Sequence, residues 1–148
     1  LPIDAHLPHD YIGTERLRLE MYKRLAEVRS NEDVEALAAE MKDRYGNPPA
    51  PVKSLLAVAL FRVRARQAGI TEVTMAGRNV RFHPVDLPES RVVRLNRLYP
   101  KSLVKKSVES ILVPRPTPKP TEPLRDEELL AWARGVIDTI IDPVTTSA

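Results

Sequence analysis

Three histidines are the side chains best suited to bind a metal ion in a chain that contains no cysteine. His6 and His9 lie in a segment flanked by prolines, and His83 stands directly before Pro84. Zinc sites usually draw on cysteines or on two histidines one helical turn apart, and the sequence supplies neither arrangement. We therefore expect no metal site, and the lack of cysteine also excludes disulfides and thiol nucleophiles.

Paired carboxylates could act as general acid and general base. They occur at Glu32/Asp33 and at residues 126–128, and each group stands where a helical pattern begins. A carboxylate at that position stabilises the positive end of the helix dipole, so we interpret both groups as structural. The chain has no Gly-x-x-x-x-Gly-Lys phosphate-binding loop, and its 5 glycines are scattered. The sequence thus predicts no catalytic residues, no cofactor and no enzymatic activity of this chain itself.

Positive charge is concentrated in the middle of the chain. Residues 1–60 carry 8 Lys/Arg and 10 Asp/Glu (−2), residues 61–119 carry 13 and 4 (+9), and residues 120–148 carry 2 and 6 (−4). Six cations of the basic middle form a candidate interaction surface: Arg62, Arg66, Arg91, Arg94, Arg97 and Lys101. Such a surface can bind phosphates or an acidic protein, and it can also be a solvated polar face. Tyr99 is the single aromatic residue between Arg91 and Lys101, and one ring offers little for stacking along a single strand.

The first half of the chain reads as three helices. Apolar residues recur at helical spacing in each, and Ser30 with Asp33 has the spacing of a capping box at the start of the second helix. Gly69 is placed to end the third. The apolar faces are expected to share one core, and their residues are Leu17, Met21, Leu25 and Val28, then Val34, Leu37, Ala38 and Met41, then Val52, Leu55, Leu56, Ala59, Leu60 and Val63.

Beyond Gly69 the apolar period changes to two, which predicts a β-hairpin with its turn at Gly77. A helix is expected over residues 88–99, and strands over residues 103–105 and 108–113. Helices first and a small, mostly antiparallel sheet afterwards is the order of an α+β fold. We expect residues 1–113 to form this domain.

A proline at nearly every second position predicts a stiff, extended linker over residues 114–124, before a helical arm over residues 125–148. The arm carries an apolar face expected to dock in an apolar groove, formed by Leu129, Trp132, Val136, Ile137 and Ile140. An extended tether could reach a neighbouring molecule, so exchange of the arm between two copies is a further possibility.

The sequence contains no apolar run long enough to span a bilayer and no signal-peptide pattern, so a cytoplasmic location is expected. The chain starts at Leu1 without a methionine, and we expect it to be part of a longer polypeptide.

Three segments together resemble a known family. Residues 43–49 (Asp-Arg-Tyr-Gly-Asn-Pro-Pro) join two helical patterns, and they follow residues 7–12 (Leu-Pro-His-Asp-Tyr-Ile) and residues 18–24 (Arg-Leu-Glu-Met-Tyr-Lys-Arg) at a characteristic spacing. The amino-acid sequences of these segments resemble those of the C-terminal domain of the bacterial transcription-repair coupling factors, the Mfd family. The matching positions carry the family's structural motif, with Tyr45 where a phenylalanine is usual, and they are Arg18, Asp43, Arg44, Gly46 and Pro49. We expect Asp43 to pair with Arg18.

The resemblance implies a role without chemistry. Proteins of this family are ATP-driven DNA translocases that remove stalled RNA polymerase and recruit nucleotide excision repair. Their C-terminal domain folds back on an N-terminal UvrB-like module of the same polypeptide and masks the surface that recruits UvrA. The resemblance therefore implies an autoinhibitory, regulatory protein-interaction domain whose parent acts with RNA polymerase, UvrA and duplex DNA. The alternative from the residues alone is a basic nucleic-acid-binding module.

Overall fold

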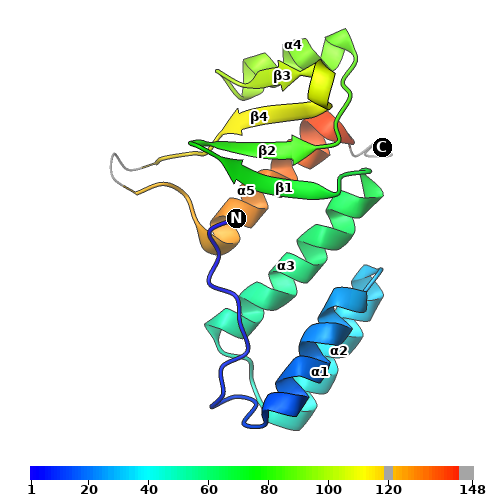
Figure 1. Ribbon diagram of the computed structural model, residues 1–148, viewed down its shortest axis with the longest axis vertical. Coiled ribbons are helices and arrows are strands. Elements are labelled where there is room, and N and C mark those ends of the chain that lie inside the picture. The colour runs from blue at the N-terminus through cyan, green and yellow to red at the C-terminus, as the bar shows by residue number, and fades with distance from the viewer. Residues whose placement is uncertain (119–121, 144–148) are drawn as a thin grey trace, which may run out of the picture. The chain divides into compact units, whose positions relative to one another are not determined.

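The computed structural model describes residues 1–118 and 122–143 (Figure 1). The chain divides into two compact units, which we call the helical unit (residues 2–64) and the sheet unit (residues 65–148 with Leu1). The architecture is α+β, as predicted, with helices α1–α5 and one four-stranded antiparallel sheet. The division into a domain over residues 1–113, a linker and an arm stays a prediction.

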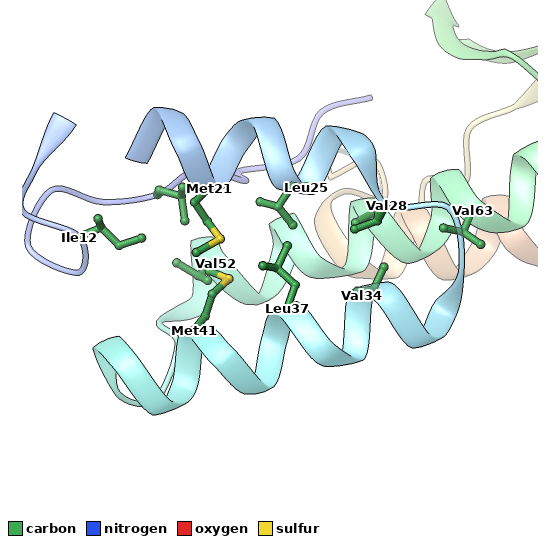
Figure 2. Packing of buried hydrophobic residues seen from close by; sticks show 11 residues of the cluster. Ile12, Met21, Leu25, Val28, Val34, Leu37, Met41, Val52 and Val63 are labelled. Carbon is green, nitrogen blue, oxygen red and sulfur yellow. The ribbon is translucent and has the colours of Figure 1, made fainter. Parts of the chain in front are cut away.

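The helical unit contains α1 (Glu15–Glu27), α2 (Asn31–Tyr45) and most of α3 (Ala50–Gln67). Figure 2 shows their apolar side chains pointing toward one another. All three helices contribute to this core, together with the N-terminal segment. Its buried members are Leu7, Ile12, Met21, Leu25, Val28, Val34, Leu37, Met41, Val52, Ala59 and Val63. The helical periodicity read from the sequence is thereby confirmed for the three helices.

Local signals set the ends of α2. The Ser30 hydroxyl accepts a hydrogen bond of 3.1 Å from the Asp33 amide, and the Asp33 carboxylate accepts one of 3.0 Å from the Arg29 amide. These contacts satisfy N–H groups that have no partner inside the helix. At the other end Gly46 adopts φ +90° with ψ −171°, a backbone conformation open in practice to glycine alone, and its N–H bonds the Lys42 carbonyl at 3.0 Å. The chain therefore turns at Gly46 and restarts as α3.

The sheet unit is built on strands in the order β1-β2-β4-β3. Strand β1 (Glu72–Ala76) and strand β2 (Asn79–His83) form the expected hairpin, with Met75 opposite Val80 and Gly77 at φ +63° in the turn. Strand β3 (Leu103–Lys105) is as predicted. Strand β4 (Ser110–Pro114) begins two residues later than expected, because Lys106–Val108 form the short helical turn η1.

Two helical elements complete the sheet unit. Helix α4 (Glu89–Leu98) follows the hairpin, and α5 (Asp126–Val136) continues into the π-helical turn η2 (Ile137–Ile141). Figure 1 shows α5 running behind the sheet. Most apolar side chains of α5 are buried, and so are Val80, Phe82, Ile111 and Val113 of β2 and β4.

The proline-rich segment is not the extended tether expected from its composition. The Leu124 amide donates a hydrogen bond of 2.7 Å to the Pro116 carbonyl, and the Arg115 side chain donates one of 2.6 Å to the Leu124 carbonyl. Residues 116 and 124 therefore lie side by side, whereas residues 119–121 lie outside the described residues. Repeated prolines restrict φ, but they leave the carbonyl groups free to accept such bonds. Because these two residues meet, the prediction of a fully extended tether is wrong. Arm exchange relied on the long reach of such a tether.

Candidate interaction surfaces

The motif of residues 43–49 is held by contacts far apart in the sequence. The Tyr11 hydroxyl donates a hydrogen bond of 2.9 Å to the Gly46 carbonyl, and the rings of Tyr11 and Tyr45 lie 5.8 Å apart between centroids. Burial, and then the neighbouring Tyr45, raise the pKa of the Tyr11 hydroxyl. The Pro49 carbonyl accepts bonds of 3.0 Å from the Val52 and Lys53 amides at the start of α3. Sequence reasoning missed Tyr11, since 35 residues separate it from Gly46.

The expected ion pair between Arg18 and Asp43 is wrong. Arg18 donates a hydrogen bond of 2.7 Å to the main-chain carbonyl of Ile12, and so fixes the N-terminal segment where it enters α1. Asp43 is exposed and makes no ion pair with the residues that the structure describes. An exposed carboxylate is already solvated and needs no cationic partner.

Instead, Glu40 is the carboxylate of α2 that pairs. Arg24 of α1 binds both oxygens of Glu40, and Arg44 lies 3.6 Å from Glu40 and 5.1 Å from the centre of the Tyr45 ring. The hydrogen bond from Arg24, and then the charges of both arginines, lower the pKa of the Glu40 carboxyl. The Glu40–Arg44 spacing of four residues could have been found in the sequence, whereas Arg24 is 16 residues away.

A hollow of about 310 Å³ lies beside this network. Its lining combines one arginine, three carboxylates and apolar groups from α1 and α2, and the residues are Arg24, Glu27, Val28, Asp33, Ala36, Leu37 and Glu40. The excess of carboxylates would repel a phosphate and attract a cationic group.

Two of the six cations in the candidate interaction surface donate hydrogen bonds to main-chain carbonyls. Arg62 donates a hydrogen bond of 2.6 Å to the Leu25 carbonyl within the helical unit, and Arg91 donates one of 2.9 Å to the Ile141 carbonyl within the sheet unit. Both arginines therefore fasten helix ends. Arg62 and Arg66 lie one turn apart on α3, and both are exposed.

The remaining cations, Arg94, Arg97 and Lys101, are exposed and make no ion pair with the described part of the chain. Lys101 lies beyond the end of α4, in a turn where its φ is +68°. Of these three cations, Arg94 and Arg97 thus lie on α4, and Lys101 lies in the turn that follows it.

The apolar face of the arm lies inside the sheet unit. Leu129, Val136, Ile137 and Ile140 are completely buried, and Trp132 is half-buried with its ring edge-on to Tyr99 at 6.2 Å. Tyr99, at the end of α4, also places its hydroxyl 3.4 Å from Thr139. These apolar side chains are thus buried within this chain, and docking of the arm in a groove stays a prediction.

In residues 1–118 and 122–143, no three His, Cys, Asp or Glu side chains are arranged so that they could hold a metal ion. His6 lies 3.0 Å from Asp4, and His83 lies 3.1 Å from the Val108 carbonyl and 3.2 Å from Ser110. No described helix is both long and apolar enough to cross a membrane.

Comparison with known proteins places these features in context. The family model of the TRCF domain matches residues 1–94. A transcription-repair-coupling factor of Mycobacterium tuberculosis is 43% identical over 147 residues, 95% of this chain, and one of Staphylococcus haemolyticus is 32% identical over 80 residues, 54% of this chain. The chain spans only 12% and 7% of the length of these relatives.

A solved structure described as the C-terminal domain of a transcription-repair coupling factor superposes with a TM-score of 0.67. It shares 19% sequence identity, and the match covers 97% of this chain and 93% of the other. The likeness supports the fold described above.

Proposed function

The chain belongs to the TRCF domain family, whose model matches residues 1–94, and we propose that it is a non-catalytic, regulatory domain of a transcription-repair coupling factor. In this proposal the domain restrains its parent, an ATP-dependent DNA translocase, by docking on the N-terminal UvrB-like module and covering the UvrA-recruiting surface. The family match carries the proposal. The parent would then act with RNA polymerase, UvrA and duplex DNA in transcription-repair coupling.

The contacts of the described residues support the non-catalytic part. The arginines and carboxylates that pair do so with one another or with main-chain carbonyls, as Arg18, Arg24 and Arg62 do. A phosphoryl-transfer site needs a phosphate cradle and a convergent lysine and carboxylates, and the sequence has no such loop. Calorimetric titration of the chain with ATP is therefore expected to give no binding heat.

The hollow on the helical unit is the candidate docking surface for the restraining contact. Its lining contains the apolar residues Val28 and Leu37 beside the carboxylates Glu27, Asp33 and Glu40. A partly apolar hollow with charged edges is typical of protein–protein interfaces, and the carboxylates select a basic partner surface.

Deletion of this domain from the full-length parent tests the restraint. A lid lowers activity by favouring the closed state, so the truncated parent is expected to show faster ATP hydrolysis or tighter UvrA binding. A coupling free energy of about 1–3 kcal/mol corresponds to changes of about 5- to 150-fold. If both quantities are unchanged, the domain does not restrain its parent.

Point variants of the parent test the surface. Glu27→Lys reverses a rim charge of the hollow and is expected to activate the parent partly. Glu35→Lys is the matched control, because Glu35 is exposed on α2 but does not line the hollow. Equal effects of the two variants would remove the hollow as the docking surface.

The alternative, a basic nucleic-acid-binding module, is favoured by the exposed Arg94, Arg97 and Lys101. Binding of duplex DNA through three phosphate contacts would give a logarithmic salt slope of about −2.7. Retention of the chain on duplex DNA with that salt dependence would support the alternative, and no retention at low salt would exclude it.

A further inference from the structure

Residues 91–106 carry six cations and no carboxylate: Arg91, Arg94, Arg97, Lys101, Lys105 and Lys106. Arg91 bonds the Ile141 carbonyl, and Lys106 lies 3.4 Å from Glu89. Arg94, Arg97 and Lys101 remain exposed without an ion pair in the described part of the chain. The stretch therefore presents uncompensated positive charge.

The same stretch exposes apolar side chains. Among the described residues, six large hydrophobic side chains are exposed, and four of them lie between residues 93 and 108: Val93, Leu98, Leu103 and Val108. Val93 is 66% exposed and Leu98 47%. Single exposed apolar residues are common, but a group of them beside unpaired cations marks an interaction site.

Helix geometry places four of these residues, two cations and two apolar residues, next to one another on α4. Val93 with Arg97, and Arg94 with Leu98, are spaced four residues apart on α4 and so are neighbours on its surface. The Ser102 hydroxyl donates a hydrogen bond of 2.6 Å to the Tyr99 carbonyl, in the tight turn that leads directly to Leu103. We define the α4 surface as Val93, Arg94, Arg97, Leu98, Lys101 and Leu103.

The opposite face of α4 holds this surface rigid. Leu95 is completely buried, Arg91 is bonded to Ile141, and Tyr99 packs against Trp132. Since the helix is fixed before a partner arrives, little conformational entropy is lost on binding.

We propose that the α4 surface binds an acidic protein segment that carries apolar side chains, such as an amphipathic helix. Carboxylates would meet the three free cations, and leucine-like side chains would cover Val93, Leu98 and Leu103. Duplex DNA fits less well, because contacts to phosphates would leave the exposed apolar side chains uncovered. This inference goes beyond the restraint of the parent, and binding to the 148-residue chain alone tests it.

The test is an NMR titration of the full 148-residue chain with three probes. These are a synthetic amphipathic peptide with glutamate and leucine at helical spacing, the same peptide with serine in place of leucine, and a short DNA duplex. The first probe is expected to shift amide signals of residues 93–103, and the other two are expected to leave them unchanged or to bind at least about tenfold more weakly.

Variants separate charge from apolar contact. Arg94→Glu with Arg97→Glu, and separately Leu98→Ser, are each expected to weaken peptide binding by about tenfold. Lys23→Glu with Lys53→Glu, and Leu19→Ser, are matched controls on exposed positions of the helical unit and should bind like the original chain. Circular dichroism melts confirm that every variant is folded.

Three results would overturn the proposal. The first is the absence of shifts at residues 93–103 with the leucine-containing peptide. The second is equal weakening of peptide binding by the control variants. The third is binding of the DNA duplex at the same amides with an affinity that Leu98→Ser does not change. The last result would assign the surface to nucleic acid instead.

Discussion

The hydroxyl of Tyr11 donates a hydrogen bond of 2.9 Å to the main-chain carbonyl of Gly46, and thereby ties the N-terminal segment to the turn between α2 and α3. The same hydroxyl lies 3.3 Å from the Met41 carbonyl. The Gly46 carbonyl lies beyond the last residue of α2, so it has no partner inside the helix, and Tyr11 supplies one. The bond also positions residues 43–49, the motif shared with the family.

Tyr11→Phe is expected to lower the free energy of unfolding by about 1 kcal/mol, because it removes the donor and keeps the ring. Urea denaturation at neutral pH measures the change. Tyr45→Phe is the matched control, since the Tyr45 ring packs on Tyr11 but its hydroxyl makes no hydrogen bond with the residues described. Equal stability of Tyr11→Phe and the original chain would show that water replaces the bond without loss.

Glu40 predicts a loss of stability in acid. Hydrogen bonding from Arg24 lowers the pKa of Glu40 in the folded state below its ordinary value of 4.5. A lowered folded pKa contributes stability that is present above pH 4.5 and is lost as the pH falls through the folded pKa. Denaturation midpoints measured between neutral pH and strong acid should therefore fall less for Glu40→Gln than for the original chain. Parallel curves for the two proteins would mean that the contact with Arg24 is fully screened by water.

Gly46→Ala is expected to destabilise the fold by about 1–3 kcal/mol. The cost is conformational, because no atom lies within 4 Å of the position that the new Cβ would occupy, whereas φ of +90° strains any L side chain. Gly13→Ala is the control, with a Cβ contact of 3.7 Å to the His9 carbonyl and no positive φ. Thermal melts of the two variants decide the matter, and a similar loss in both would argue against backbone strain.

Ile140→Ala is expected to cost about 2–5 kcal/mol, as is usual when a buried isoleucine is truncated. The side chain is completely buried in the turn that follows α5. Leu19→Ala, at a position that is 61% exposed, should change stability by less than about 0.5 kcal/mol. Chemical denaturation compares the two, and equal stability would show that the arm does not contribute to the core.

Light scattering tests the remaining possibility of arm exchange. Because the Leu124 amide bonds the Pro116 carbonyl, the segment before α5 folds back and the arm is expected to stay with its own chain. A monomer is therefore expected at all accessible concentrations. A concentration-dependent dimer that is lost when the chain ends at Pro114 would restore the exchange hypothesis.

Local pattern determined much of this protein. Helical spacing of apolar residues located α1, α2 and α3, and alternation located the β1–β2 hairpin, because side-chain burial on one face follows directly from the backbone period. Ser30, Asp33 and Gly46 set the ends of α2 through contacts within a few residues, which a sequence displays. Residues 43–49, taken together with residues 7–12 and 18–24, resembled the family through their residue types and spacing.

Long-range pairing was decided only by the tertiary structure. The sequence favoured an Arg18–Asp43 pair, but folding brings Arg18 to the Ile12 carbonyl and Arg24 to Glu40. It also suggested six cations as a candidate interaction surface, and folding brings two of them, Arg62 and Arg91, into hydrogen bonds with main-chain carbonyls 37 and 50 residues away. Charge and spacing show that a side chain needs a partner or water. Which of the two it receives depends on which carbonyls and carboxylates the folded backbone brings within about 3 Å, and only the three-dimensional path of the chain sets that distance.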